Sequence, residues 1–70
     1  MGVRIEVNIS GWRFVRVSSE YIDVYPPGSP YPVDNINVFD YEKGEGAPNT
    51  MTVVWDKAYD WMLDMEILDV

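Results

Sequence analysis

The chain has 70 residues and a formal net charge of −7, and it contains neither cysteine nor histidine. A chain of this length forms at most one domain, and it buries only about 60% of the surface that its unfolded form exposes. The missing residue types exclude disulfide bonds and the usual zinc sites, together with the commonest general base and the thiol nucleophile of enzymes. We therefore expect one non-enzymatic domain, residues 1–70, with no cofactor and no bound metal.

The negative charge is concentrated in the later part of the chain. Residues 1–19 carry three arginines against one glutamate, a net charge of +2, whereas residues 20–70 carry two lysines against eleven acids, a net charge of −9. Such a surface repels a phosphate backbone and attracts a basic protein surface. A protein partner is therefore favoured over nucleic acid.

Neither a membrane span nor a secretion signal is predicted. No apolar run approaches the roughly 18 residues that a spanning helix requires. The N-terminal stretch MGVRIEVNIS also lacks a charged segment followed by an apolar one. We expect a non-secreted, cytoplasmic protein without membrane contact.

The N-terminal segment has the pattern of a β-hairpin. Apolar and polar residues alternate from Val3 to Ile9, and Ser10-Gly11 is typical of a tight turn into a second strand, residues 12–17. In this second strand the aromatic residues share one face and the valines share the other. Either a bulge near Gly11 or apolar packing on both faces would accommodate that arrangement.

Two more strands are predicted, at residues 21–25 and 36–41. Pro26 ends the first of them because proline offers no N–H to a ladder. The stretch PPGSPYP, residues 26–32, is typical of an extended surface loop. A second loop is expected at residues 42–49, where two glycines and a proline interrupt regular structure.

The C-terminal stretch DKAYDWMLDMEILDV, residues 56–70, predicts a helix. Asp56 is expected to be its N-cap, preceded by a short last strand at residues 51–55, because Thr52-Val53-Val54 is a poor helix opening. A helix that begins at Asn49 or Thr50 and runs through this segment is the alternative.

The expected helix separates its charges from its apolar residues. At about 100° per residue, Asp56, Asp60 and Asp64 form one stripe. The opposite face carries Ala58, Trp61, Met62 and Met65. Tyr59 and Leu63 lie on the shoulder, so the apolar surface is larger than one sheet face requires, which indicates a second contact.

These elements predict an α+β fold. A small antiparallel sheet of three to four strands, with an N-terminal β-hairpin and meander topology, would carry one C-terminal helix packed on one face.

The leading functional hypothesis is a small acidic interaction module, an adaptor or inhibitor, that binds a larger and basic host protein surface. Its composition resembles in general style the small accessory proteins of bacteriophages, although no motif carries residues over. The acidic helix would steer the encounter, and exposed aromatic residues would anchor it. The residues expected to contact the partner are Asp56, Asp60, Asp64, Tyr59, Trp61, Tyr25 and Tyr31.

Four alternatives stand beside this hypothesis, and for the acidic stripe taken alone solubility is the simpler explanation. The acidic stripe could serve solubility alone, and the surplus apolar surface could make a self-associating homo-oligomer without a charged partner. Arg13 and Arg16 beside aromatic residues could bind single-stranded nucleic acid, but pairing with acids or stacking on aromatics suits them better. The loop acids lack the spacing of a calcium-binding loop. These acids are Asp34, Asp40, Glu42 and Glu45.

Overall fold

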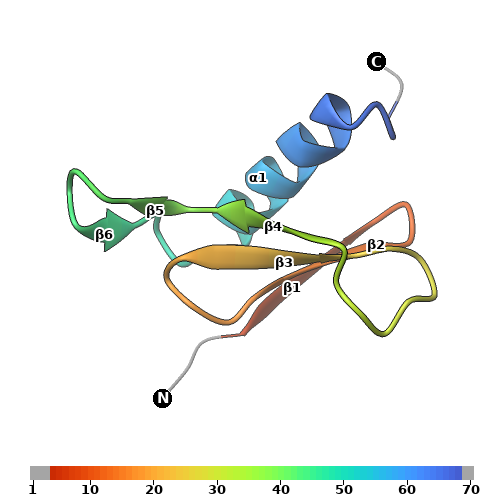
Figure 1. The fold of residues 1–70 in the computed structure, drawn as a ribbon, viewed down its shortest axis with the longest axis horizontal. Coiled ribbons are helices and arrows are strands. Elements are labelled where there is room, and N and C mark those ends of the chain that lie inside the picture. Colours follow the sequence, from red (N-terminus) through yellow and green to blue (C-terminus); the bar gives the residue numbers. More distant parts are fainter. Residues whose placement is uncertain (1–3, 69–70) are drawn as a thin grey trace.

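A computed structural model describes residues 4–68 and consists of a four-stranded antiparallel sheet with one helix across one of its faces (Figure 1). The elements are β1 (Ile5–Ile9), β2 (Trp12–Arg16), β3 (Tyr21–Tyr25), β4 (Asp34–Asn37), β5 (Phe39–Asp40), β6 (Glu45–Gly46) and α1 (Met51–Asp64). The main sheet has the order β1-β2-β3-β4, a meander, and β5 and β6 form a separate two-stranded sheet. The predicted α+β architecture is confirmed.

The β1–β2 hairpin closes with a type I′ turn. Ser10 and Gly11 have φ angles of 51° and 86°, which match the right-handed twist of the flanking strands. The register runs without interruption from the pair Ile9–Trp12 to the pair Ile5–Arg16, so the turn needs no bulge. On the face of β2 opposite the helix, Val15 is buried between Glu6 and Asp23 of the neighbouring strands, whereas Val17 is 54% exposed. Val3, predicted as part of the first strand, lies outside the described residues.

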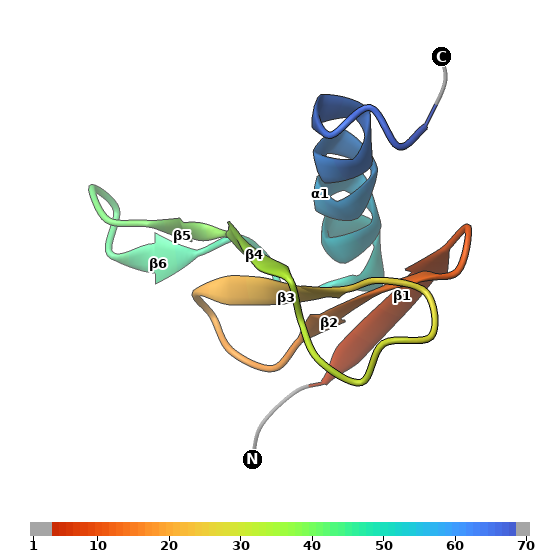
Figure 2. The ribbon, with the colours of Figure 1, turned by 45° about the vertical axis from the view of Figure 1, so that its right-hand side comes forward.

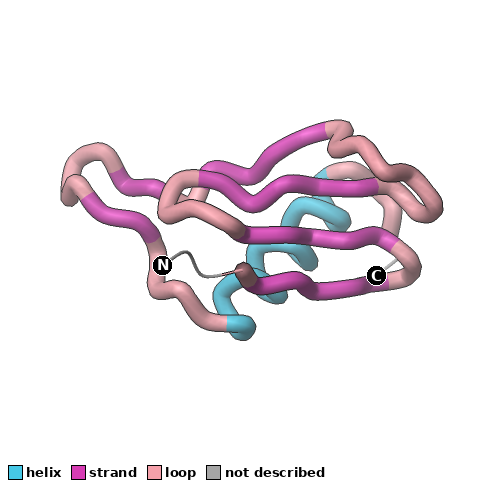
Figure 3. Tube along the Cα trace, turned by 90° about the horizontal axis from the view of Figure 1, so that it is seen from below, coloured by secondary structure: helices cyan, strands magenta, loops and turns pink. Residues whose placement is uncertain are grey.

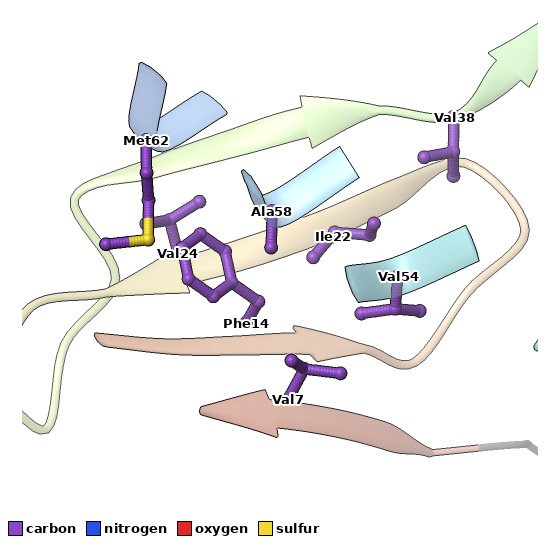
Figure 4. Close-up of a cluster of buried hydrophobic side chains, with 8 residues drawn as sticks. All are labelled: Val7, Phe14, Ile22, Val24, Val38, Val54, Ala58 and Met62. Carbon is purple, nitrogen blue, oxygen red and sulfur yellow. The ribbon is translucent and has the colours of Figure 1, made fainter. Parts of the chain in front are cut away.

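The core lies between the sheet and α1 (Figure 4). Val54, Ala58 and Met62 recur at every fourth position of the helix, and all three are fully buried. This spacing places them in one line along the helix. They meet one layer of buried residues from the sheet and from the segment between β4 and β5: Val7, Phe14, Ile22, Val24 and Val38.

The helix begins earlier than expected. Thr50 is its N-cap, with φ −125° and ψ 156°, and its hydroxyl accepts a hydrogen bond of 3.2 Å from the Val53 N–H. The prediction of a strand at residues 51–55 and of an N-cap at Asp56 is therefore wrong. Burial of Val54 extends the apolar line by one turn, and this packing outweighs the weak helix propensity of the β-branched residues.

Exchange of the two candidate caps for alanine separates them experimentally. We expect Thr50→Ala to lower the free energy of unfolding by about 1 kcal/mol, because the Val53 N–H loses its acceptor. Asp56→Ala should change it by less than about 0.5 kcal/mol, since an exposed mid-helix aspartate caps nothing. Urea denaturation measures both values. A larger loss for Asp56→Ala than for Thr50→Ala would contradict the observed start.

The helix ends at Asp64, short of the predicted residue 70. Glu66 has a φ angle of 59°, and the Ile67 N–H donates to the Met62 carbonyl at 2.9 Å, the arrangement of a Schellman motif. The turn directs Ile67 back onto the core cluster. Residues 69 and 70 lie outside the described chain.

The strand predicted at residues 36–41 is divided in two. Val38 lies between β4 and β5, where its N–H donates to the Glu20 carbonyl and its own carbonyl accepts from the Ala47 N–H, both at 2.8 Å. The chain then pairs with β6, inside the segment expected to be a loop. Figure 2 shows this β5–β6 hairpin projecting away from the main sheet. The Asp40 carboxylate stabilises its turn by accepting from two backbone N–H groups.

Arg16 is buried on the helix side of the sheet, with 1% of its surface exposed. It was expected to pair with an acid or to stack on an aromatic ring, and it does neither. Its guanidinium donates instead to four backbone carbonyls. These belong to Ala47 at 2.8 Å, Pro48 at 2.9 Å, Ser18 at 3.0 Å and Ser19 at 3.5 Å. Arg16 therefore fastens the loop after β2 to the segment that leads into α1.

Candidate protein-binding surface

The acidic stripe consists of Asp56, Asp60 and Asp64, which are all exposed on the side of α1 away from the core. Within residues 4–68 none of the three carboxylates forms an ion pair. The observed ion pairs lie on the sheet, where Glu6 meets Arg4 at 2.9 Å and Arg13 at 3.9 Å. The stripe thus presents charges that the described part of the chain leaves uncompensated.

Glu6 on β1 carries the ion-paired carboxylate, and its pKa is lower than that of an isolated glutamate. Hydrogen bonds from the Arg4 guanidinium and the Asn8 amide hold the pKa of Glu6 below its ordinary value of 4.5. Arg4 and Arg13 also surround this carboxylate with positive charge. The negative charge of β1 is therefore compensated locally.

Beside the acidic stripe lies an aromatic flank, formed by Met51, Trp55 and Tyr59. Trp55 and Tyr59 stack with ring centroids 5.0 Å apart and planes inclined by 12°. Met51 is 64% exposed and Trp55 is 45% exposed. Met51 was not expected in such a surface because the helix was expected to begin at Asp56. The spacing of four residues was the signal that could have identified it.

Trp61 is half-buried and packs against the core. Its ring lies 5.5 Å from that of Trp12 and 5.9 Å from that of Phe14, centroid to centroid. Its indole N–H donates to the Asp34 carboxylate at 3.0 Å. Trp61 was expected to anchor a partner if it lay exposed, and the structure leaves it half-buried with its ring turned to the sheet.

Tyr25 and Tyr31 lie apart from the helix. Tyr25 ends β3, with the Arg13 guanidinium carbon 4.5 Å from its ring centroid, a cation–π arrangement. Tyr31 is 75% exposed in the loop before β4. Alternation along β2 and β3 places Tyr25 on the sheet face opposite α1. The residues expected to bind a partner therefore do not form one continuous surface.

An open hollow of about 530 Å³ lies between the β5–β6 hairpin and the start of α1. Its charged lining is mixed, with three acids and two lysines, of which Lys57 comes from the helix. In the described chain no three acidic side chains approach closely enough to hold a metal ion. Because Lys57 lines this hollow together with residues of the small hairpin, the helix flank that carries Lys57 faces that hairpin.

No helix within residues 4–68 combines the length and the apolar character needed to cross a membrane. Comparison of the chain with protein-family models, curated proteins and solved structures finds no match.

Proposed function

We propose that the protein is a small, non-enzymatic interaction module of the cytoplasm, an adaptor or inhibitor, whose acidic helix binds a basic surface of a larger protein. The observation that supports this proposal is the acidic stripe of three exposed aspartates without an ion-pair partner in the described chain. Charges arranged in this way attract a basic surface and orient it before contact.

The placement of the charges supports a role outside the helix itself. Each pair of like charges four residues apart costs a helix about 0.2 to 0.5 kcal/mol. Asp64 lies in the last turn, where a negative charge opposes the helix dipole, and no basic residue offsets it there. The positive charges of a basic partner would attract these aspartates and offset the repulsion between them.

The test uses two variants that remove equal charge from different places. The stripe variant is Asp56→Asn, Asp60→Asn and Asp64→Asn. The control variant is Glu20→Gln, Glu42→Gln and Glu45→Gln, whose side chains are exposed on the β2–β3 loop and the small hairpin. Both variants change the net charge by the same amount, so a difference between them reports position and not total charge.

Immobilised wild-type protein captures partners from cells that carry it, and the dissociation constant of each captured protein is then measured. We expect the stripe variant to bind about tenfold more weakly, since three exposed charges contribute roughly 0.5 kcal/mol each. The control variant should bind like the wild type. If both variants bound equally weakly, or if both bound like the wild type, the stripe would have no specific role in binding and would serve solubility.

A further inference from the structure

β1 forms one edge of the main sheet and pairs only with β2. Its sequence IEVNI contains no proline and no lysine, and its register with β2 contains no bulge. Proline, lysine and bulges are among the features by which proteins prevent an edge strand from pairing with another chain. In the described part of the chain, this edge is therefore left open to a further strand.

The hairpin turn determines which backbone groups face outward. A two-residue type I′ turn closes on a hydrogen-bonded pair, which here is Ile9 with Trp12. Because hydrogen-bonded and non-hydrogen-bonded pairs alternate along antiparallel strands, the groups of Val7 also point to β2. The N–H and C=O groups of Glu6 and Asn8 then point to the open edge.

The aromatic flank lies on the same side of the molecule as this edge. Trp61 points to β2 and β4, and Lys57 points to the small hairpin. At about 100° per residue, Trp55 and Tyr59 lie on the opposite flank of α1. The helix packs mainly on β1, and Figure 3 shows its first turn emerging beyond the outermost strand, which is β1.

The exposed part of this flank is apolar and hollowed. Met51, Thr52 and Trp55 line a shallow depression of about 320 Å³ that holds no charged side chain. Exposed apolar side chains gathered beside an open strand edge are typical of protein–protein contacts.

We propose that two copies of this chain associate through the open edge of β1 and the aromatic flank of α1. A two-fold axis at Val7 would pair the two β1 strands antiparallel and join the two four-stranded sheets. Both helices then lie on the same side of the joined sheet, with their aromatic flanks facing each other across the axis.

The side chains of β1 fit this register. An axis at Val7 places Glu6 opposite Asn8 of the second copy, and Ile5 opposite Ile9. The outward-facing N–H and C=O groups of the two strands then meet. No carboxylate faces another carboxylate, and Glu6 already has Arg4 at 2.9 Å. The pairing therefore avoids the like-charge contacts that destabilise cross-strand neighbours.

A second copy suits this surface better than a basic partner does. The described aromatic flank carries no carboxylate for a lysine or arginine to contact, whereas its apolar side chains match an identical flank. The acidic stripe remains outside the interface. Because each copy carries a net charge of −7, repulsion between the copies opposes association and is screened by salt.

Sedimentation equilibrium tests the dimer over a range of salt concentrations. We expect a species of twice the 8.1 kDa chain mass. Its dissociation constant should fall as NaCl rises from about 0.05 M to about 0.5 M, because screening weakens the repulsion. Binding of a basic partner should weaken over the same range. A strict monomer at every salt concentration would overturn the proposal.

Variants locate the interface. Asn8→Pro removes one outward N–H without removing a β1–β2 bond, and Trp55→Ser removes the exposed ring. Each should raise the dimer dissociation constant at least about tenfold. Tyr41→Ser, which changes a 65% exposed ring on the small hairpin, is the control and should leave the constant unchanged.

The dimer and the proposed function fail separately. The triple aspartate variant should keep or strengthen the dimer while binding the basic partner about tenfold more weakly. Trp55→Ser needs no strand distortion, so it tests the interface even if Asn8→Pro does not fold. A dimer that persists with Trp55→Ser at wild-type strength would contradict the assigned interface.

Discussion

Replacement of Arg16 by methionine is expected to lower the free energy of unfolding by about 3 kcal/mol. Methionine fills much of the space but donates no hydrogen bond. The carbonyls of Ala47 and Pro48, 2.8 and 2.9 Å from the guanidinium, would lose their donors beside a side chain that is 1% exposed. Arg16→Lys should cost about 2 kcal/mol, because one ammonium cannot reproduce the planar fork. Urea denaturation monitored by tryptophan fluorescence measures the loss.

Arg13→Met is the matched control for this prediction. The Arg13 side chain is 36% exposed, and it forms an ion pair at 3.9 Å, one hydrogen bond of 3.3 Å to the Ser29 carbonyl and a contact with the ring of Tyr25. Such exposed contacts contribute about 1 kcal/mol or less. Equal losses at Arg13 and Arg16 would mean that water replaces the guanidinium at the four carbonyls.

Trp61→Ala is expected to destabilise the fold by about 4 kcal/mol, since a large aromatic side chain is removed from between helix and sheet. Its contacts with Trp12 and Phe14, and its hydrogen bond to Asp34, join α1 to β2 and β4. Trp61→Phe should keep the packing and lose about 1 kcal/mol with the indole N–H. Thermal unfolding followed by circular dichroism measures both variants.

Trp55→Ala is the companion variant in the same helix. Trp55 is 45% exposed and stacks only on the neighbouring turn, so its removal should cost less than about 1 kcal/mol. If Trp55→Ala were as destabilising as Trp61→Ala, the distinction between a half-buried Trp61 packed on the sheet and an exposed Trp55 would be incorrect.

The sheet was predictable because its signals are local. Alternation identified β1, and Ser10-Gly11 identified the turn that closes it. The helical period also placed Asp56, Asp60 and Asp64 together on one side of the helix. Each of these features depends on residues close together in the chain.

The helix start was missed because two local rules compete there. Residues 51–55 have β propensity, while the spacing of Val54, Ala58 and Met62 continues the apolar line of the helix. Packing against the sheet decides between them, and the propensity of the segment alone does not reveal it.

The role of Arg16 depends on contacts far along the chain. It shares strand parity with Trp12 and Phe14, which places it on the core side. Its two closest acceptors come from residues 47 and 48, more than 30 positions away. Trp61 likewise meets Asp34, 27 positions away. Sequence patterns give such side chains a direction but no partner.

The proposal of a basic partner rests on the acidic stripe, and the salt dependence of wild-type and stripe-variant binding tests it most directly. The dissociation constant of the captured partner is measured for both proteins between about 0.05 M and about 0.5 M NaCl. We predict that the wild type loses affinity as salt rises, and that the variant with Asp56, Asp60 and Asp64 changed to asparagine binds weakly with a much smaller salt dependence. Identical salt profiles and affinities for the two proteins would contradict the proposed role of the acidic helix.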